Sequence, residues 1–180
     1  MDKSIKKIAI IGTGVIGSGW IIRLLAKNKT VYVYDPDKFQ IIFLKNEIKR
    51  ISKSVLSFYK LKKINTKNIL FKNSIKEAVN DVDLIQENVP ENLKIKKKII
   101  AEISKHAKPK AIIASSSSGL LPTKIQQSCT YPERFLIAHP FNPVYLLPLV
   151  EIVKGKKTSS FYSKKSEKFY LSIGMHPLIL

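Results

Sequence analysis

Short apolar runs alternate along this chain with longer stretches in which apolar residues recur at helical spacing. The runs predict strands at residues 8–11, 31–34, 69–72, 82–86, 110–114, 135–138, 149–153 and 175–180. The stretches between them predict helices at residues 15–27, 75–80, 92–106, 121–128 and 158–172. Because strand and helix alternate without a linker or an internal repeat, we predict one α/β domain over residues 1–180 with a mostly parallel sheet.

Residues 37–64 form the longest helical stretch, and we expect one or two helices there with a break near residues 52–57. The candidate buried positions are Phe39, Ile42, Phe43, Ile48, Ile51, Val55 and Phe58. The lysines between them indicate a solvent-facing side. The alternative is an arm that contacts an anionic substrate tail.

Three glycines follow the first predicted strand and open the first predicted helix. Gly12 permits a tight turn, Gly14 leaves the backbone open to a pyrophosphate, and Gly17 lets the helix lie close to the strand. The helix N-terminus then offers free N–H groups to phosphates. Asp35 ends the second strand, where a carboxylate accepts hydrogen bonds from ribose hydroxyls and repels a 2′-phosphate. This pattern predicts a Rossmann-type, doubly wound fold that binds NAD rather than NADP.

Composition excludes several other classes of protein. The net charge of +19 comes almost entirely from lysines spread along the chain, without the interleaved aromatic residues of a nucleic-acid site, so we expect no nucleic-acid partner. We find no apolar run long enough to span a membrane and no signal peptide, and we predict no metal site. Cys129 is the only cysteine, which fits a reducing cytoplasm.

Polar residues follow several predicted strands, where sites in such sheets are built. Glu87 comes after strand 82–86 and is a candidate for the cofactor site, or else a carboxylate at a helix entry. Residues 115–118 are four serines, which form either a solvated loop or a set of hydroxyl groups turned to a ligand.

A histidine and a carboxylate give the chain its candidate catalytic pair. His139 ends a predicted strand and is followed by Pro140 and Pro143, which stiffen the backbone there, and Glu151 is a charged residue inside the apolar run 149–153. A carboxylate in such a run is costly unless it is paired. Pairing with imidazole would fix one ring tautomer and raise the basicity of His139, which suits proton removal from an alcohol. Asn142 lies close by in the sequence.

With these segments in place, the chain resembles the NAD-binding domain of the 3-hydroxyacyl-CoA dehydrogenase family. Residues 11–17, 86–93, 115–120 and 139–144 carry the resemblance. It implies that His139 is the general base and Glu151 its partner, and that Ser118 and Asn142 bind the substrate oxygen region. It also implies an NAD site lined by Gly12, Gly14, Gly17, Asp35 and Glu87.

Within that family, residues 14–20 and 142–153 are similar to the branch that oxidises L-carnitine. Tyr145 and Phe141 would offer aromatic faces to a trimethylammonium group, or else only pack. A 3-hydroxyacyl-CoA is the alternative small-molecule substrate, and an NAD-binding module that is inactive by itself is a further alternative. Family members continue past the last predicted strand into a helical domain that dimerises, whereas this chain stops at Leu180. We therefore expect that domain to be absent here and an apolar surface to be exposed where it would dock. For the full-length protein we expect a homodimer.

Overall fold

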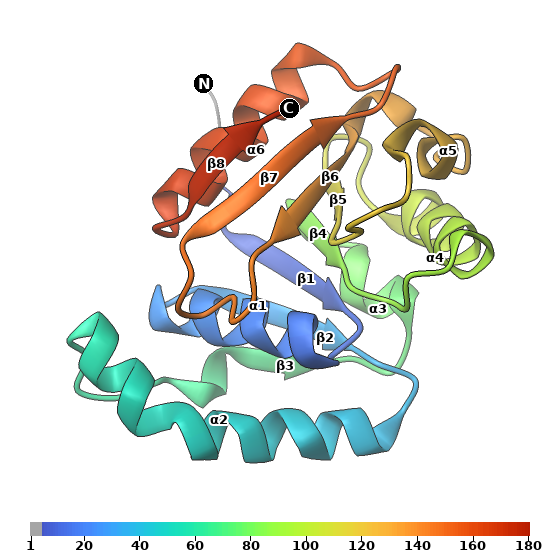
Figure 1. Cartoon of the computed structure of the whole chain (residues 1–180). Coiled ribbons are helices and arrows are strands. Elements are labelled where there is room, and N and C mark those ends of the chain that lie inside the picture. Colours follow the sequence, from blue (N-terminus) through green and yellow to red (C-terminus); the bar gives the residue numbers. More distant parts are fainter. Residues whose placement is uncertain (1–4) are drawn as a thin grey trace.

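The computed structural model describes residues 5–180 and shows one twisted sheet with helices on both faces (Figure 1). The strands are β1 (Lys7–Ile11), β2 (Thr30–Tyr34), β3 (Ile69–Phe71), β4 (Leu84–Glu87), β5 (Ile112–Ser115), β6 (Phe135–Pro140), β7 (Leu149–Lys154) and β8 (His176–Ile179). The α-helices are α1 (Val15–Ala26), α2 (Lys38–Tyr59), α3 (Ile75–Val79), α4 (Leu93–His106), α5 (Pro122–Gln126) and α6 (Ser160–Ser172). Short 3₁₀ turns, η1 (Thr66–Asn68) and η2 (Pro132–Arg134), precede β3 and β6.

The sheet has the strand order β3-β2-β1-β4-β5-β6-β7-β8. All neighbouring strands are parallel except β6 and β7, which are antiparallel. The order reverses at β1, between the β2 side and the β4 side. Ligands of doubly wound sheets bind in the crevice at such a switch point, outside the carboxyl ends of the strands. The predicted Rossmann-type fold is therefore confirmed.

Two apolar cores lie on the two faces of the sheet. One core packs α1, α2 and α6 on the sheet, and the other packs α3, α4 and α5 on the opposite face. Along β1, Ile8 and Ile10 face the first core, whereas Ala9 and Ile11 face the second. Because both faces are covered, β1 reads as a continuous apolar run rather than as an alternating one.

Helix α2 is continuous, so the predicted break near residues 52–57 is wrong. The Asp37 side chain accepts a hydrogen bond from the Phe39 amide at its start, and Lys60 ends it with a φ of 52°. Inside the helix, the hydroxyl of Ser52 donates to the carbonyl of Lys49, and Val55 is fully buried. The serines therefore sit within the helix and do not interrupt it.

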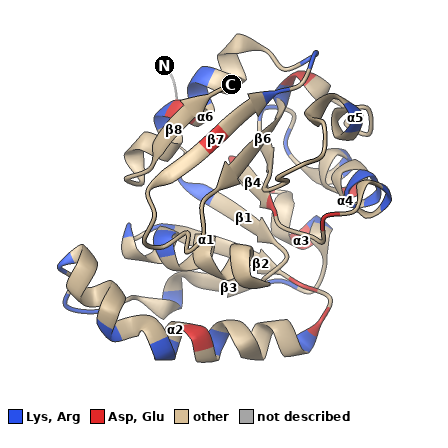
Figure 2. Ribbon diagram, viewed as in Figure 1, with Lys and Arg blue, Asp and Glu red and all other residues tan. Residues whose placement is uncertain are grey.

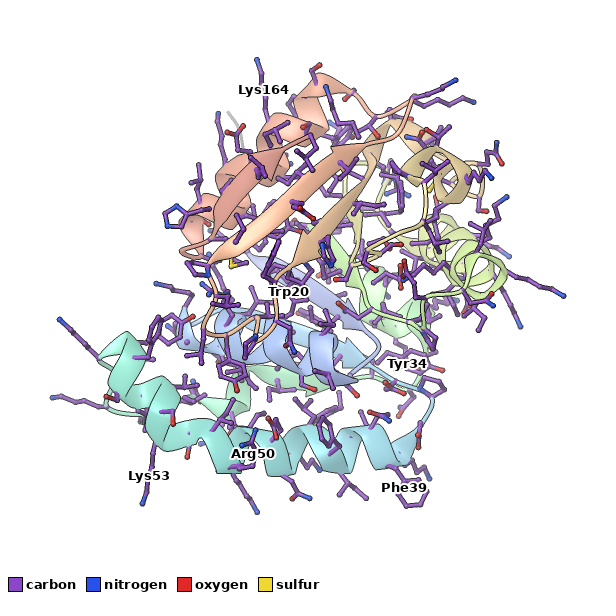
Figure 3. All side chains as sticks on the ribbon, viewed as in Figure 1. Trp20, Tyr34, Phe39, Arg50, Lys53 and Lys164 are labelled. Atoms are coloured by element: carbon purple, nitrogen blue, oxygen red, sulfur yellow. The ribbon has the colours of Figure 1, made fainter. Side chains whose placement is uncertain are left out.

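Only part of the burial predicted for α2 is correct. Its buried residues are Leu44, Ile48, Ile51 and Val55, one narrow stripe at helical spacing. Phe39, Ile42, Phe43 and Phe58 are exposed, and Phe39 points away from the protein at the start of the helix (Figure 3). The prediction assigned a wide apolar face to a helix that contacts the domain along one edge only.

Exposed charge is spread over the helices rather than gathered on one of them (Figure 2). Large exposed apolar side chains occur on α2 and also near the C-terminal end, where Phe161, Leu171, Leu178 and Ile179 are each at least 41% exposed. That such a surface docks another domain stays a prediction. Among the described helices, none has the length and hydropathy needed to cross a membrane.

Candidate functional site

The turn between β1 and α1 requires glycine at two positions. Gly12 has a φ of +88°, and a Cβ there would lie 2.8 Å from the carbonyl oxygen of Asn88. A Cβ on Gly17 would lie 1.9 Å from the carbonyl oxygen of Gly12. These contacts bring the start of α1 against the ends of β1 and β4, as the glycine pattern predicts.

Gly14 differs from the other two glycines because a Cβ there would meet nothing within 4 Å. The protein itself therefore leaves room for a side chain at this position. Gly14 lines two adjacent hollows, one of about 610 Å³ and one of about 350 Å³. The bare backbone at the helix N-terminus thus faces open space on both sides, which suits a phosphate group held by N–H donors.

Asp35 lies in the larger of these hollows, at the end of β2. Its Oδ2 atom accepts hydrogen bonds from the amide and hydroxyl groups of Thr13, at 2.7 and 3.1 Å, and its Oδ1 atom accepts one from the amide of Asp37 at 2.9 Å. These donors fix the carboxylate at the rim. A carboxylate has about four lone-pair sites, so acceptor capacity remains for the hydroxyl groups of a ligand.

His139 and Glu151 are partners across the antiparallel pairing of β6 and β7. The Nδ1 atom of His139 lies 2.9 Å from the Oε2 atom of Glu151, and both side chains are partly exposed. The carboxylate therefore fixes the imidazole through Nδ1 and leaves Nε2 for another partner. The structure brings this predicted pair together.

The smaller hollow joins His139 to the glycine turn. It is lined by Gly14, Val15, Asn88, Ser116 and Ser118 together with His139 and several neighbours. Its volume is about 350 Å³. The predicted residues His139 and Ser118 therefore share one hollow with the backbone at Gly14.

Glu91 holds the serine loop in place, a role that sequence reasoning missed. Its Oε1 atom accepts hydrogen bonds from the Ser117 hydroxyl and from the amides of Ser118 and Gly119, at 2.6 to 3.1 Å. Burial opposes the charged form of Glu91, but these donors and the nearby Lys96 ammonium outweigh it and lower the pKa of the Glu91 carboxyl. The sequence offers no local signal for this role, because Glu91 and the residues that it bonds are 26 to 28 positions apart.

Ser116 lies in a buried polar network that the sequence did not reveal. Its hydroxyl accepts hydrogen bonds from Trp20 Nε1 at 3.2 Å and from Gln86 Nε2 at 2.8 Å, and it donates to Asn88 Oδ1 at 2.8 Å. The hydroxyl of Tyr170 donates to Gln86 Oε1 at 2.6 Å. This network ties α1, β4 and α6 together beneath the hollow of His139.

Glu87 requires a correction, because its side chain faces into the protein and not into the cofactor hollow. It is completely buried and lines neither of the two hollows beside Gly14. Its carboxylate accepts from the amide of Val89, from the ammonium group of Lys96 and from the hydroxyl of Ser115, at 2.5 to 2.8 Å. Glu87 therefore fixes the loop after β4, close to its alternative interpretation as a carboxylate at a helix entry.

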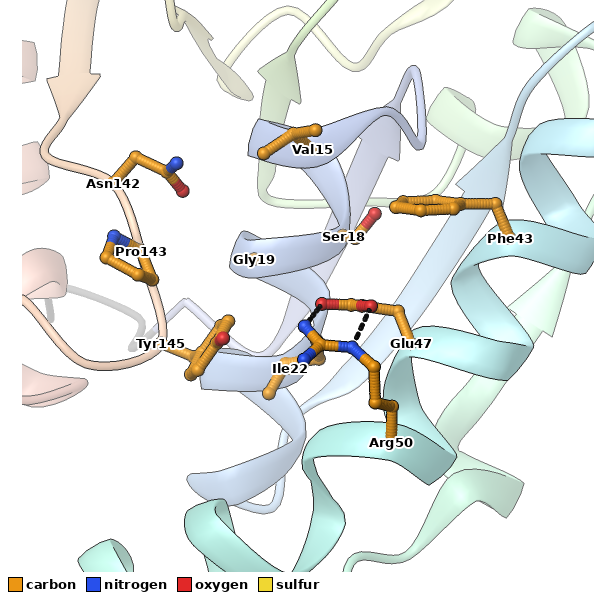
Figure 4. Close-up of a pocket in the computed structure, with 10 residues that line it drawn as sticks. All are labelled: Val15, Ser18, Gly19, Ile22, Phe43, Glu47, Arg50, Asn142, Pro143 and Tyr145. Carbon is orange, nitrogen blue, oxygen red and sulfur yellow. Dashed lines mark hydrogen bonds and ion pairs between the residues drawn. The ribbon is translucent and has the colours of Figure 1, made fainter.

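Asn142 lies in a third hollow, of about 220 Å³, between α1, α2 and the loop at residues 141–148 (Figure 4). Val15 lines both this hollow and the one that holds His139. Asn142 is therefore adjacent to the His139 hollow but does not line it. The hollow of His139 thus shares Gly14 with the larger hollow and Val15 with the third.

Arg23 of α1 anchors the loop that carries Asn142. The buried guanidinium donates to the carbonyl groups of Val144 and Leu147, at 2.6 and 3.2 Å, and to that of Gly174 at 3.1 Å. From α2, the hydroxyl of Tyr59 donates to the carbonyl of Tyr145 at 2.8 Å. An arginine inside an apolar helix was the signal for this anchor.

Comparisons with known proteins agree with this geometry. L-carnitine dehydrogenase of Bacillus cereus is 45% identical over 177 residues, covering 98% of this chain and 54% of that protein. L-carnitine dehydrogenase of Staphylococcus epidermidis is also 45% identical, with 96% and 54% covered. The structure of 3-hydroxybutyryl-CoA dehydrogenase from Escherichia coli K12 matches with a TM-score of 0.90 and 26% identity, covering 98% of this chain and 38% of that one.

The chain thus spans about half the length of the curated relatives that it matches. The model of a protein family, the NAD binding domain of 3-hydroxyacyl-CoA dehydrogenase, matches residues 7–180. That match covers nearly the whole chain, including the glycine turn, the serine loop and the pair of His139 and Glu151. The chain therefore belongs to the family of the 3-hydroxyacyl-CoA dehydrogenase NAD binding domain.

Proposed function

We propose that the protein is an NAD-dependent dehydrogenase that oxidises the hydroxyl group at position 3 of L-carnitine. The observation that carries this proposal is the pair of His139 and Glu151, whose Nδ1 and Oε2 atoms are 2.9 Å apart. His139 lines the hollow that Gly14 and Ser118 also line. A proton acceptor beside a nicotinamide site is what oxidation of an alcohol requires.

The residues of the two larger hollows fit NAD. Asp35 would hold the hydroxyl groups of the adenosine ribose, and the backbone at Gly14 and the start of α1 would hold the pyrophosphate. The open space at Gly14, which a Cβ would fill without touching the protein, supports this assignment. When bound, NAD supplies the hydride acceptor.

In the proposed reaction, Nε2 of His139 takes the proton of the substrate hydroxyl. Glu151 keeps the proton of the neutral ring on Nδ1 and stabilises the imidazolium that forms. Ser118 and Asn142 would donate hydrogen bonds to the substrate oxygen region. Ser118 shares the hollow of His139, which supports its part more directly than that of Asn142.

The relatives support this substrate, since the proteins that are 45% identical are named L-carnitine dehydrogenases. A 3-hydroxyacyl-CoA is the second candidate, because the domain also matches a 3-hydroxybutyryl-CoA dehydrogenase with a TM-score of 0.90. We further propose that residues 1–180 act as the NAD-binding domain, and that the complete enzyme is a homodimer.

Initial rates of NAD reduction test the proposal. The protein is supplied with L-carnitine, with D-carnitine as a stereochemical control, and with 3-hydroxybutyryl-CoA. Oxidation of L-carnitine alone supports the proposal. Oxidation of 3-hydroxybutyryl-CoA alone would mean that the substrate is a 3-hydroxyacyl-CoA instead. Binding of NAD without turnover of any of the three would support a binding module instead.

A further inference from the structure

Among the described residues, Asn88 alone has a polar side chain and lines both the larger hollow and the hollow of His139. The other residues that these two hollows share are Gly14, Val89 and Pro90. Resting on the placement of NAD under the proposed function, we infer that Asn88 is a specificity residue for the dinucleotide. Its side-chain oxygen would accept a hydrogen bond from a hydroxyl group of the ribose that carries the nicotinamide.

Asn88 follows β4 directly and lies against the glycine turn. Its carbonyl oxygen is 2.8 Å from the place of a Cβ on Gly12, and its own Cβ is 3.5 Å from the place of a Cβ on Gly17. The start of α1, where the backbone at Gly14 offers N–H donors to a pyrophosphate, is therefore next to Asn88.

The order of the groups in NAD brings the second ribose to this place. Asp35 lines the larger hollow and is the proposed partner of the adenosine ribose. Gly14 lines both hollows and is the proposed contact of the pyrophosphate, whereas His139 lines the smaller hollow. In a dinucleotide that runs in this direction, the ribose of the nicotinamide comes directly after the pyrophosphate. It therefore lies at the boundary of the two hollows, which Asn88 lines.

The direction of the Asn88 amide is fixed by partners that can only accept. Its Nδ2 atom donates to the carbonyl of Gln86 at 2.9 Å and to that of Ile11 at 3.4 Å. A backbone carbonyl has no proton to donate, so the nitrogen atom must lie on this side. The Oδ1 atom then lies on the other side, where it accepts a hydrogen bond from the hydroxyl of Ser116 at 2.8 Å.

The direction of the Ser116 hydroxyl is fixed in the same way. The indole of Trp20 can only donate, and its Nε1 atom lies 3.2 Å from the Ser116 oxygen. The Nε2 atom of Gln86 donates to the same oxygen at 2.8 Å and to the carbonyl of Ala138 at 3.2 Å, which fixes the direction of that amide. Both lone pairs of the hydroxyl oxygen are thus used, and its proton is left for Asn88.

Asn88 therefore offers an acceptor to a ligand and no N–H group that lacks a partner. A carbonyl oxygen has two lone pairs, and Ser116 uses one of those on Oδ1. Phosphate oxygens are acceptors as well, so the remaining lone pair disfavours contact with the pyrophosphate. A ribose hydroxyl supplies the missing donor. Ser116 itself lines the hollow of His139, so Oδ1 lies 2.8 Å from a group in the wall of that hollow.

Calorimetric titrations with ADP and ADP-ribose test the inference. Both ligands carry the adenosine ribose and the two phosphates, but only ADP-ribose carries the second ribose. In Asn88→Ala, binding of ADP-ribose should weaken by about three- to ten-fold, as for the loss of one hydrogen bond between uncharged groups. Binding of ADP should stay within about two-fold of the wild-type value. Neither measurement needs nicotinamide, a substrate or turnover.

A second comparison needs no variant. In the wild-type protein, ADP-ribose should bind about three- to ten-fold more tightly than an analogue whose second ribose has hydrogen in place of its two ring hydroxyl groups. If Asn88 is the acceptor, Asn88→Ala should reduce this preference towards one. A preference that is equal in the two proteins would assign the contact to another residue and overturn the inference.

Asn46→Ala is the matched control, because Asn46 is exposed on α2 and lines none of the three hollows. It should bind both ligands as the wild type does. The chain has a single tryptophan, and its indole N–H bonds Ser116 and not Asn88. In Asn88→Ala, this N–H should therefore still exchange slowly with solvent by NMR, which verifies that the site is folded.

Unchanged binding of ADP-ribose in Asn88→Ala, or an equal loss for ADP and ADP-ribose, would each overturn the inference. These outcomes are separate from failure of the proposed function. If ADP binds but ADP-ribose does not depend on Asn88, only the role of Asn88 is wrong. If the wild-type protein binds neither ligand, the proposed placement of NAD is wrong, and the role of Asn88 is wrong with it.

Discussion

The Nδ1 atom of His139 lies 2.9 Å from Oε2 of Glu151, although twelve positions separate the two residues in the chain. Strands β6 and β7 form the only antiparallel pair in the described sheet, and its register places these two residues opposite each other. Directly opposite side chains on neighbouring strands project from the same face. The reversal of one strand therefore builds the histidine–carboxylate pair.

Replacing His139 with Gln should lower the turnover number by about 10²- to 10⁴-fold, because the substrate hydroxyl loses its proton acceptor. The dissociation constant for NADH should stay within about two-fold of the wild-type value, since Asp35 and Gly14 are untouched. Stopped-flow turnover and NADH fluorescence titration measure the two quantities. Normal turnover in this variant would remove His139 from the mechanism.

Replacing Asp35 with Ala should weaken NADH binding by about ten- to 150-fold, the equivalent of about 1.5–3 kcal/mol for hydrogen bonds to a charged group. NADPH should lose less, because the carboxylate that repels its 2′-phosphate is removed. Fluorescence titrations with both dinucleotides give the comparison. An unchanged ratio of the two affinities would show that Asp35 does not select the cofactor.

Replacing Arg23 with Met should destabilise the protein by at least about 2 kcal/mol, because several buried carbonyl groups lose their donor. Urea denaturation measures this loss. Lys53→Met on the outer side of α2 is the control, with an expected change within about 0.5 kcal/mol. Equal stabilities for the two variants would mean that the loop at residues 141–148 is held without Arg23.

Glu91 gives the serine loop a dependence on pH. The pKa of its carboxyl is lowered from the ordinary 4.5 in the folded protein, so its stabilising contribution is fully present above that value and is lost as the pH falls through the lowered pKa. The amide NMR shifts of Ser118 and Gly119 should therefore titrate with a midpoint below 4.5. Glu91→Gln should abolish this transition, and a midpoint above 4.5 in the wild type would contradict the assigned contacts.

The sequence predicted the elements whose patterns are local. The apolar run of β1, the glycines of the turn and Asp35 lie within one strand–helix–strand unit, and their spacing follows from that unit alone. The pair of His139 and Glu151 was predicted because a carboxylate in an apolar strand requires a partner. Burial on α2 was predicted poorly, since which edge of a long helix meets the domain depends on tertiary packing.

Contacts between distant segments escaped prediction. Glu87 was assigned to the cofactor hollow by its place after β4, but the ammonium of Lys96 and the hydroxyl of Ser115 turn its carboxylate inward. Glu91 bonds the serine loop 26 to 28 positions away, and nothing in either segment alone signals that contact. Such partners become visible only when the strand order brings β4 and β5 together.

A titration of the protein with NADH, followed by nicotinamide fluorescence and then by addition of L-carnitine or acetoacetyl-CoA, tests the account most directly. We predict that NADH binds and that L-carnitine changes the signal of the bound dinucleotide. The reason is that the hollow of His139, the proposed substrate site, shares Gly14 with the larger hollow, the proposed site of the adenosine ribose. A response to acetoacetyl-CoA alone would contradict the proposed substrate. Failure of NADH to bind would contradict the assignment of the glycine turn and Asp35, and with it the whole account of the site.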